Sequence, residues 1–215
     1  LSLHDALPIS DYILVKQGGK INAVGTPDKP IVMTSEKEEP GAWGGIHICG
    51  RAHTNAEGGK GSSEIGGAVY GGNDDADNSG TLQYIRLEYT GFAFDEEHEA
   101  NGISFYGVGN GTIVDHCQAY KGSDDGFEFF GGSVNVSNLV AVSCSDDSFD
   151  WTEGWNGKGT NLVAYQEAES TLGYDCDCLM ECDNNGSNNA ATPVAHPVLK
   201  NLILVGNGGS KQGIR

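Results

Sequence analysis

The sequence predicts an all-β solenoid, a coil of short strands in which each repeat forms one turn. The segment DDGFEF at residues 124–129 returns as DDSFDW at residues 146–151, and every matched position lies 22 residues further on. Both copies place aromatic residues at alternate positions after an Asp doublet, which is the pattern of a strand with one buried face. Helical periodicity is absent throughout, and a strand repeat of about 20–30 residues is typical of solenoids.

The composition argues against two classes of partner. The 215 residues include 30 Asp and Glu but only 12 Lys and Arg, which gives a formal net charge of −18. A negative field of this size repels nucleic acid and anionic lipid, and no apolar run approaches the roughly 18 residues of a membrane span. We therefore expect no nucleic-acid partner and no membrane span. The charge attracts cations and fits a solvated extracellular surface.

The domain is expected to cover residues 11–215 as a single unit. The preceding segment 1–10, LSLHDALPIS, fits no repeat, and two interpretations remain open. It is either a short irregular cap or a non-native leader, because it resembles the translation of a sequencing adapter. Solenoids need polar caps at their ends, and the final residues GNGGSKQGIR supply no closing element. We therefore expect this chain to be a fragment of a longer protein.

The first strands are predicted from short runs of alternating apolar residues, bounded by Gly and Pro turns. The alternating pairs are Ile13/Val15, Ile21/Ala23, Ile31/Met33 and Ile46/Ile48. Residues 50–80 then form a long excursion rich in Gly, Asn, Ser and Asp with no period, which predicts a surface loop.

Two columns of inward-facing residues can be followed through the later repeats. The first column is Ile85, Cys117, Leu139, Leu162 and Leu202, and the second is Ile103, Phe127, Phe149 and Met180. The short steps within the columns are bare coils of about 22 residues, and the longer steps carry inserted loops. An Asn stands just before three residues of the first column, at positions 138, 161 and 201. These Asn residues either form a hydrogen-bonded ladder at a corner or merely tolerate the corner dihedral angles.

The chain resembles the right-handed parallel β-helix proteins of the pectate-lyase-like superfamily. More narrowly, it resembles secreted or lipid-anchored β-helix surface proteins of Bacteroidota-type bacteria. The phrases that carry this resemblance are GGKINAVGTPDKPIVMTS, WGGIHICGRA, DNSGTLQYIRLEYTG and KGSDDGFEFFGGSVNVSNLVAVSCSDDSFDWTEGWNGKG. The resemblance covers about residues 12–206 and implies the fold. It does not fix an activity, because the superfamily holds lyases, hydrolases, adhesins and structural fibres.

The repeated acids predict a cation site. Neighbouring coils lie about 4.8 Å apart, and two carboxylates at that separation repel by roughly 3.5 kcal/mol at an effective dielectric of 20. Partly buried acids in register therefore need a bound cation or a raised pKa. Ca²⁺ is the expected cation, because Asp-rich turns offer many oxygen ligands. The predicted ligands are Asp124, Asp125, Glu128, Asp146, Asp147 and Asp150.

Other interpretations of the same acids stay open. A polysaccharide lyase or glycoside hydrolase acting at the face from Asp124 to Asp150 would use Asp125, Asp147, Asp150 and Lys121. The alternative for Lys121, and for Lys158, is a charge partner of the acids. Residues 73–77, NDDAD, are a second candidate for Ca²⁺, and a solvated acidic turn is the alternative in both places.

Several remaining side chains carry weaker expectations. Trp155 falls outside the inward alternation, so we predict that it stacks on a sugar ring. Cys117 and Cys182 hold core positions. In a secreted protein, a disulfide among Cys144, Cys176 and Cys178 is the expectation, with its pairing left open. The spacing of these cysteines argues against a zinc site. His98, among acids, would join a metal site or lie in a solvated loop.

Three functions follow as expectations. The leading one is an acidic, Ca²⁺-stabilised scaffold, extracellular or at a bacterial cell surface, that binds a glycan or a partner protein without catalysis. The second is the polysaccharide-degrading enzyme described above. The third is a subunit of an extracellular fibre, a homo-oligomer in which exposed strand edges at the coil ends pair end to end.

Overall fold

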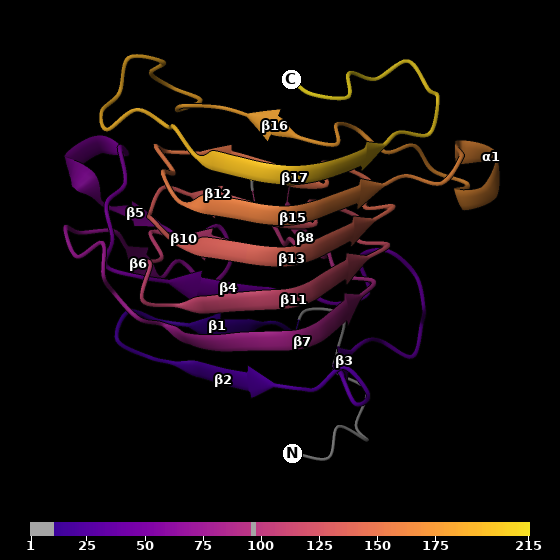
Figure 1. Cartoon of the computed structure of the whole chain (residues 1–215), viewed down its shortest axis with the longest axis horizontal. Helices are drawn as coiled ribbons and strands as arrows, with labels where there is room; N and C mark the ends of the chain where they lie inside the picture. The colour runs from indigo at the N-terminus through magenta and orange to yellow at the C-terminus, as the bar shows by residue number, and fades with distance from the viewer. Residues whose placement is uncertain (1–10, 96–97) are drawn as a thin grey trace.

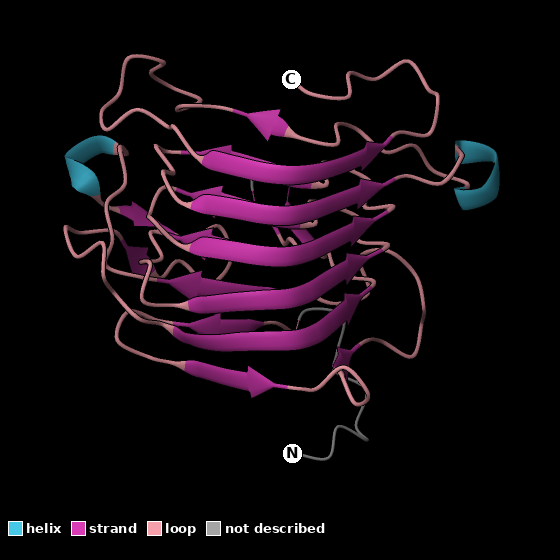
Figure 2. Ribbon diagram, in the orientation of Figure 1, coloured by secondary structure: helices cyan, strands magenta, loops and turns pink. Residues whose placement is uncertain are grey.

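The computed structural model describes residues 11–95 and 98–215, so the two interpretations of residues 1–10 lie outside the described range. Two parallel sheets make up most of the molecule, one in front of the other (Figures 1 and 2). The chain passes from one sheet to the other and winds into a right-handed parallel β-helix. The predicted fold class is therefore confirmed.

The six-stranded sheet carries the shorter strands. Its order is β1 (Ile13–Val15), β4 (Ile46–Cys49), β10 (Ile103–Tyr106), β12 (Phe127–Phe130), β14 (Phe149–Thr152) and β16 (Glu181–Cys182). Phe127 lies opposite Ile103 on one side and opposite Phe149 on the other, as the second column predicts. The rings of Phe127 and Phe149 are stacked at 5.5 Å. Successive coils therefore place similar side chains above one another in the interior of the helix.

The seven-stranded sheet carries the longer strands and lies at the front in Figure 1. It contains β2 (Ile21–Val24), β3 (Ile31–Met33), β7 (Gly80–Glu88), β11 (Ile113–Tyr120), β13 (Asn135–Val142), β15 (Lys158–Tyr165) and β17 (Val198–Val205). Cys117 pairs with Ile85, and Leu162 pairs with both Leu139 and Leu202. The first predicted column is therefore confirmed as well.

The turns that lead into the six-stranded sheet leave no room for side chains at glycines such as Gly102 and Gly126. A Cβ atom on Gly102 would lie 2.3 Å from the carbonyl oxygen of Gly126, and one on Gly126 would lie 2.7 Å from that of Ser148. Contacts under about 3 Å are sterically forbidden. Glycine at these positions therefore lets successive coils approach at the spacing of a parallel sheet.

The asparagine column forms the predicted ladder and also adopts the predicted corner conformation. The Asn161 side chain donates to Asn138 Oδ1 at 2.8 Å, and Asn201 donates to Asn161 Oδ1 at 2.9 Å. The φ angles of Asn138, Asn161 and Asn201 are 55°, 58° and 59°. These values lie in the left-handed region that Asn tolerates better than most residues. Both interpretations of the column therefore hold at once.

Replacing Asn161 by glycine is expected to separate the two contributions. Asn161→Gly keeps the left-handed backbone but removes two ladder bonds, whereas Asn201→Gly removes only one at nearly the same φ. We expect Asn161→Gly to lower the free energy of unfolding by about 1 kcal/mol more than Asn201→Gly. Urea unfolding measures both variants. Equal losses in the two would mean that the ladder bonds contribute nothing beyond the backbone angle.

The excursions between coils hold ordered structure of their own. Residues 50–80, predicted as a loop without period, contain the 3₁₀ turn η1 (Glu57–Gly59) and the antiparallel pair β5 (Gly61–Ser62) and β6 (Val69–Tyr70). A second antiparallel pair joins β8 (Ala93–Asp95) to β9 (His98–Glu99), and the short helix α1 (Glu169–Leu172) follows β15. No helix in the described part of the chain is long and apolar enough to cross a membrane.

The long excursion is held against a later coil. Within it, Tyr70 and Thr54 donate hydroxyl hydrogen bonds to the same Glu153 carboxylate oxygen, at 2.8 and 2.6 Å. The Tyr70 ring is buried. The segment is therefore packed rather than solvated, and it covers one part of the six-stranded sheet.

Candidate cation site

Three carboxylates form an outward-facing column on the six-stranded sheet. Glu128 of β12 lies opposite Asp150 of β14, and Asp150 lies opposite Glu181 of β16. Successive residues of a strand point to opposite faces. Because the aromatic residues on either side of Glu128 and Asp150 are buried in the core, these acids point away from it.

Two Asp doublets lie in the turns just before β12 and β14, and their second residues are tied to the next coil. The Asp125 carboxylate accepts the backbone N–H of Asp147 at 2.8 Å, and the Asp147 carboxylate accepts that of Cys178 at 2.5 Å. A side chain that bonds the backbone of the following turn satisfies a donor that a bare turn would leave unpaired. This contact explains why the Asp doublet recurs with the coil.

One hollow collects these carboxylates, and we call it the acidic pocket. Its volume is about 240 Å³. The lining residues are Glu64, Glu99, Asn101, Asp124, Asp125, Glu128, Asp146, Asp147, Asp150 and Glu181. All six residues predicted as metal ligands are among them.

Sequence reasoning missed three lining residues, which come from outside the repeated strands. Glu64 lies in the turn between β5 and β6, and Glu99 belongs to β9. Asn101 donates from its amide to Glu128 Oε2 at 2.5 Å and to Ser104 Oγ at 3.0 Å. The acid-rich insertion around residue 98 was the only signal for Glu99 and Asn101, and no pattern pointed to Glu64.

Burial makes the pocket acids resist ionisation. Burial, with repulsion from Glu99 and Asp146, raises the pKa of Asp124 to about 8. Burial likewise raises the pKa of Asp147 to about 9 and that of Asp150 to about 7. The same desolvation lifts the pKa values of Asp125 and Glu128 well above their usual range. A pocket of this kind holds either protons or a cation near neutral pH.

The positive charge that the chain itself supplies to offset these acids lies at one end of the pocket. Arg215 forms ion pairs with Glu181 and, at 3.9 Å, with Asp147. It is the one cationic side chain of residues 11–95 and 98–215 in ion-pair contact with the lining acids. Asp150, which lies opposite Glu181 on the neighbouring strand, has a buried Oδ1 with no hydrogen-bond partner among these residues. An unpartnered buried oxygen of this kind is available to coordinate an ion.

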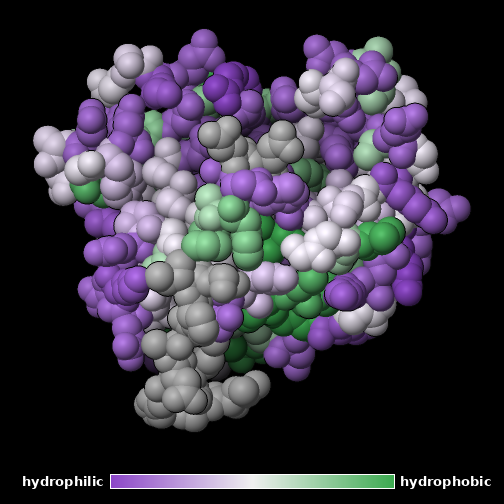
Figure 3. All heavy atoms as spheres, turned by 180° about the vertical axis from the view of Figure 1, so that it is seen from behind, coloured by the Kyte–Doolittle hydropathy of each residue, from purple (hydrophilic) through white to green (hydrophobic). Residues whose placement is uncertain are grey.

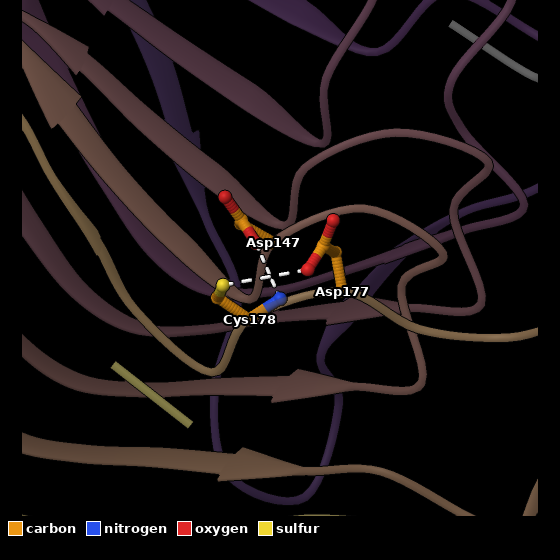
Figure 4. A group of neighbouring side chains, drawn as sticks. All are labelled: Asp147, Asp177 and Cys178. Atoms are coloured by element: carbon orange, nitrogen blue, oxygen red, sulfur yellow. Dashed lines mark hydrogen bonds between the residues drawn. The ribbon is translucent and has the colours of Figure 1, made fainter. Parts of the chain in front are cut away.

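The Arg215 end also holds a thiol, shown in Figure 4 with its two acidic neighbours. Cys178 Sγ lies 3.4 Å from Asp177 Oδ1, and Asp177 pairs with Lys211 at 3.3 Å. Burial, with repulsion from Asp147, raises the pKa of the Cys178 thiol to about 12. Metal binding requires the thiolate, so this end is less suited to a metal than the rest of the pocket.

Two overlapping groups of carboxylates are left for a cation. The first is Asp124, Asp125 and Asp146, and the second is Asp125, Glu128 and Asp150. In each group, one oxygen per residue lies within 4.8 Å of the others. Ca²⁺ accepts six to eight oxygen ligands and tolerates irregular geometry, with water completing the shell. The all-oxygen donor set therefore fits Ca²⁺.

Two predicted site residues lie outside the acidic pocket, and the prediction that Trp155 stacks on a sugar ring is wrong. Trp155 is 1% exposed, its ring stacks on Phe129 at 4.1 Å, and its Nε1–H donates to the Val134 carbonyl. It therefore belongs to the core and is not free to stack on a sugar. Lys121 pairs with Glu167 at 3.2 Å and does not line the acidic pocket. Glu167 is not one of the repeated acids, so this ion pair matches neither the catalytic role nor the alternative of a charge partner for those acids.

The remaining candidates do not join the site. Lys158 opens β15 on the other sheet, and all six cysteines are free thiols. Within residues 73–77, Asp75 pairs with His53 at 2.7 Å, and no group of possible metal ligands among the described residues includes this segment. His98 pairs with Asp95 at 2.6 Å and lies outside the acidic pocket.

The comparison with known proteins agrees with the fold. No curated protein matches the chain. A family profile described as a pectate-lyase-like β-helix domain matches residues 4–215, almost the whole sequence. Together with the two stacked parallel sheets, this match shows that the chain belongs to the family of pectate-lyase-like β-helix domains.

Proposed function

We propose that this chain is a Ca²⁺-stabilised β-helix scaffold, part of an extracellular or cell-surface protein, which binds a glycan or a partner protein without catalysis. One observation carries the Ca²⁺ part of the proposal. The acidic pocket gathers nine carboxylates, and Asp150 Oδ1 lies buried there without a donor. A bound divalent cation would offset the negative charge of these carboxylates. Among the described side chains, Arg215 is the only cationic one that forms ion pairs with them.

The pocket chemistry favours a binding role over catalysis. General acid–base catalysis works best when two groups have pKa values pushed apart, so that one donates and the other accepts a proton. Here burial raises the pKa values of Asp124, Asp147 and Asp150. Among the lining acids only Glu181 has a lowered pKa, because the effect of its burial is outweighed by its hydrogen bonds to Asp147 and Arg215, and its ion pair with Arg215 keeps it from acting as a free base. A lyase also needs a base, often Lys or Arg beside Ca²⁺, and the lining residues named above include neither.

Thermal unfolding with Ca²⁺ and with excess EDTA tests the Ca²⁺ part. A ligand that binds only the native state at 100 times its Kd adds about 2.7 kcal/mol to the free energy of unfolding. For a domain of this size that corresponds to a rise in Tm of roughly 5–10 °C. We expect Asp125→Asn to abolish the rise, because Asp125 belongs to both carboxylate groups. Asn at this position can still accept the Asp147 N–H.

The matched control is Glu57→Gln, which removes one negative charge at an exposed position outside the pocket. It is expected to respond to Ca²⁺ as the unmodified chain does. A chain whose Tm is the same in Ca²⁺ and in EDTA would refute the Ca²⁺ site. A binding screen on acidic and neutral polysaccharides, with and without Ca²⁺, then tests the glycan part, and release of reducing or unsaturated ends in that screen would refute the non-catalytic role.

A further inference from the structure

A second cavity lies beside the acidic pocket and shares Glu64 with it. Its volume is about 510 Å³, within the range of sites for small organic molecules. We call it the aromatic cavity. Its lining residues are Tyr12, Ser62, Ser63, Glu64, Gly66, Gly67, Phe94 and His98. The view from behind in Figure 3 shows hydrophobic atoms in the middle of this face, with hydrophilic atoms around them.

Three segments outside the regular coils build the walls of this cavity. Tyr12 stands just before β1, Phe94 lies in β8, and the turn between β5 and β6 closes another side. The rings of Tyr12 and Phe94 meet edge to face at 6.1 Å, and Phe92 supports Phe94 at 4.9 Å. Phe94 nevertheless remains 48% exposed. A large aromatic ring held in place beside a cavity and left in water is typical of a binding surface.

The charge of the cavity comes from Glu64 and from the acids behind it. Glu64 Oε2 accepts the Tyr106 hydroxyl at 3.2 Å, and no Lys or Arg is among the lining residues that the structure describes. His98, which also lines the cavity, lies 2.6 Å from the Asp95 carboxylate. Beyond Glu64 the acidic pocket adds eight further carboxylates. Once Glu64 is ionised, above its raised pKa of about 7, a ligand therefore meets a carboxylate and two aromatic rings in the same cavity.

We infer that the aromatic cavity binds a small organic cation, an alkyl- or arylammonium group, with the ammonium on Glu64 and its apolar part against Tyr12 and Phe94. A carboxylate supplies a charged hydrogen-bond acceptor, and aromatic faces attract cations through their quadrupole. An anion is repelled at this position, and a neutral ring gains packing but no charge interaction. The inference goes beyond the proposed function and does not depend on whether Ca²⁺ binds.

A titration of the whole chain with two probes of the same shape tests the inference. Benzylammonium and benzyl alcohol differ only in charge and hydrogen bonding, and NMR chemical shifts report their dissociation constants in EDTA at low ionic strength and pH 8, where Glu64 is mostly ionised. We expect benzylammonium to bind at least roughly ten-fold more tightly, which is one charge-assisted contact of about 1.4 kcal/mol. Glu64→Gln is expected to reduce this preference to less than about three-fold, whereas Phe94→Ala weakens both probes.

The controls separate a local contact from the general field of an acidic protein. Glu57→Gln removes the same charge at an exposed position and is expected to keep the preference for benzylammonium. Equal binding of the two probes, or no binding of either, would overturn the inference. So would a Glu57→Gln effect as large as that of Glu64→Gln, and so would methyl glucoside binding more tightly than benzylammonium.

Discussion

In a metal-free buffer with EDTA, the Tm of this domain is expected to fall as the pH rises from 5 to 8. In the unfolded chain, Asp and Glu ionise near pH 4. In the folded chain, burial raises the pKa of Asp124 to about 8, that of Asp147 to about 9, and those of Asp150 and Glu64 to about 7. The folded state therefore keeps protons that the unfolded state has already released.

The sign of the effect follows from this difference in bound protons. The free energy of unfolding changes with pH in proportion to the protons bound by the unfolded state minus those bound by the folded state. That difference is negative between about pH 4 and pH 9, so stability decreases with rising pH. Below pH 4 both states are protonated and the effect vanishes. Because the acids repel one another, we expect a combined loss of about 2–4 kcal/mol, or roughly 5–15 °C in Tm.

The groups that face these acids give the experiment its controls. Asp124 faces Glu64, Glu99 and Asp146, and the compensating cations, Arg215 and Lys211, stand at the other end. In EDTA, the double variant Asp124→Asn with Asp150→Asn is expected to be more stable at pH 8 and to show a flatter pH profile. Saturating Ca²⁺ is expected to flatten the profile of the unmodified chain. A Tm in EDTA that stays constant or rises from pH 5 to pH 8 would contradict this account.

The repeated part of the molecule could be predicted because a solenoid converts sequence spacing into spatial alignment. Once Phe127 and Phe149 are matched at 22 residues, Glu128 must lie beside Asp150, as the structure confirms. The six predicted ligands lie in one pocket for the same reason. The register between neighbouring parallel strands is therefore the long-range feature of this fold that can be predicted directly from the sequence.

The non-repeating part of the site could not be predicted, because no period constrains an inserted loop. Glu64 and Glu99 reach the pocket from the hairpins β5–β6 and β8–β9, whose paths depend on packing rather than on spacing. Tyr12 and Phe94 meet in the same way. The insertions that looked like surface loops thus supply one side of both hollows.

The error at Trp155 has a local cause. The prediction ends the alternation at the Thr-Glu-Gly turn that follows β14, which leaves Trp155 outside it. Continuing the count from Trp151 would place residue 155 on the inner side, where the structure has it. The structure shows Glu153 at φ 52° and the Trp155 N–H within 3.4 Å of the Thr152 carbonyl. This tight turn directs the indole back into the coil.

Removing the Trp155 side chain is therefore expected to destabilise the domain strongly. The indole is 1% exposed and packs between the rings of Phe129, at 4.1 Å, and Trp151, at 5.8 Å. Truncating a buried aromatic residue to alanine costs about 3–5 kcal/mol, because transfer free energy is lost and a cavity remains. For this chain length, the expected fall in Tm of Trp155→Ala is roughly 10–15 °C.

A more conservative variant shows whether the ring or its hydrogen bond matters more. Trp155→Phe keeps a ring against Phe129 but loses the bond from Nε1 to the Val134 carbonyl, which is 3.2 Å long. Because that carbonyl is buried, the loss of one partner costs about 1–3 kcal/mol, less than the alanine substitution. Both variants should retain the Tm response to Ca²⁺, since Trp155 does not line the acidic pocket. A Trp155→Ala chain within about 2 °C of the unmodified one would mean that the indole faces solvent, and would return it to the candidates for sugar stacking.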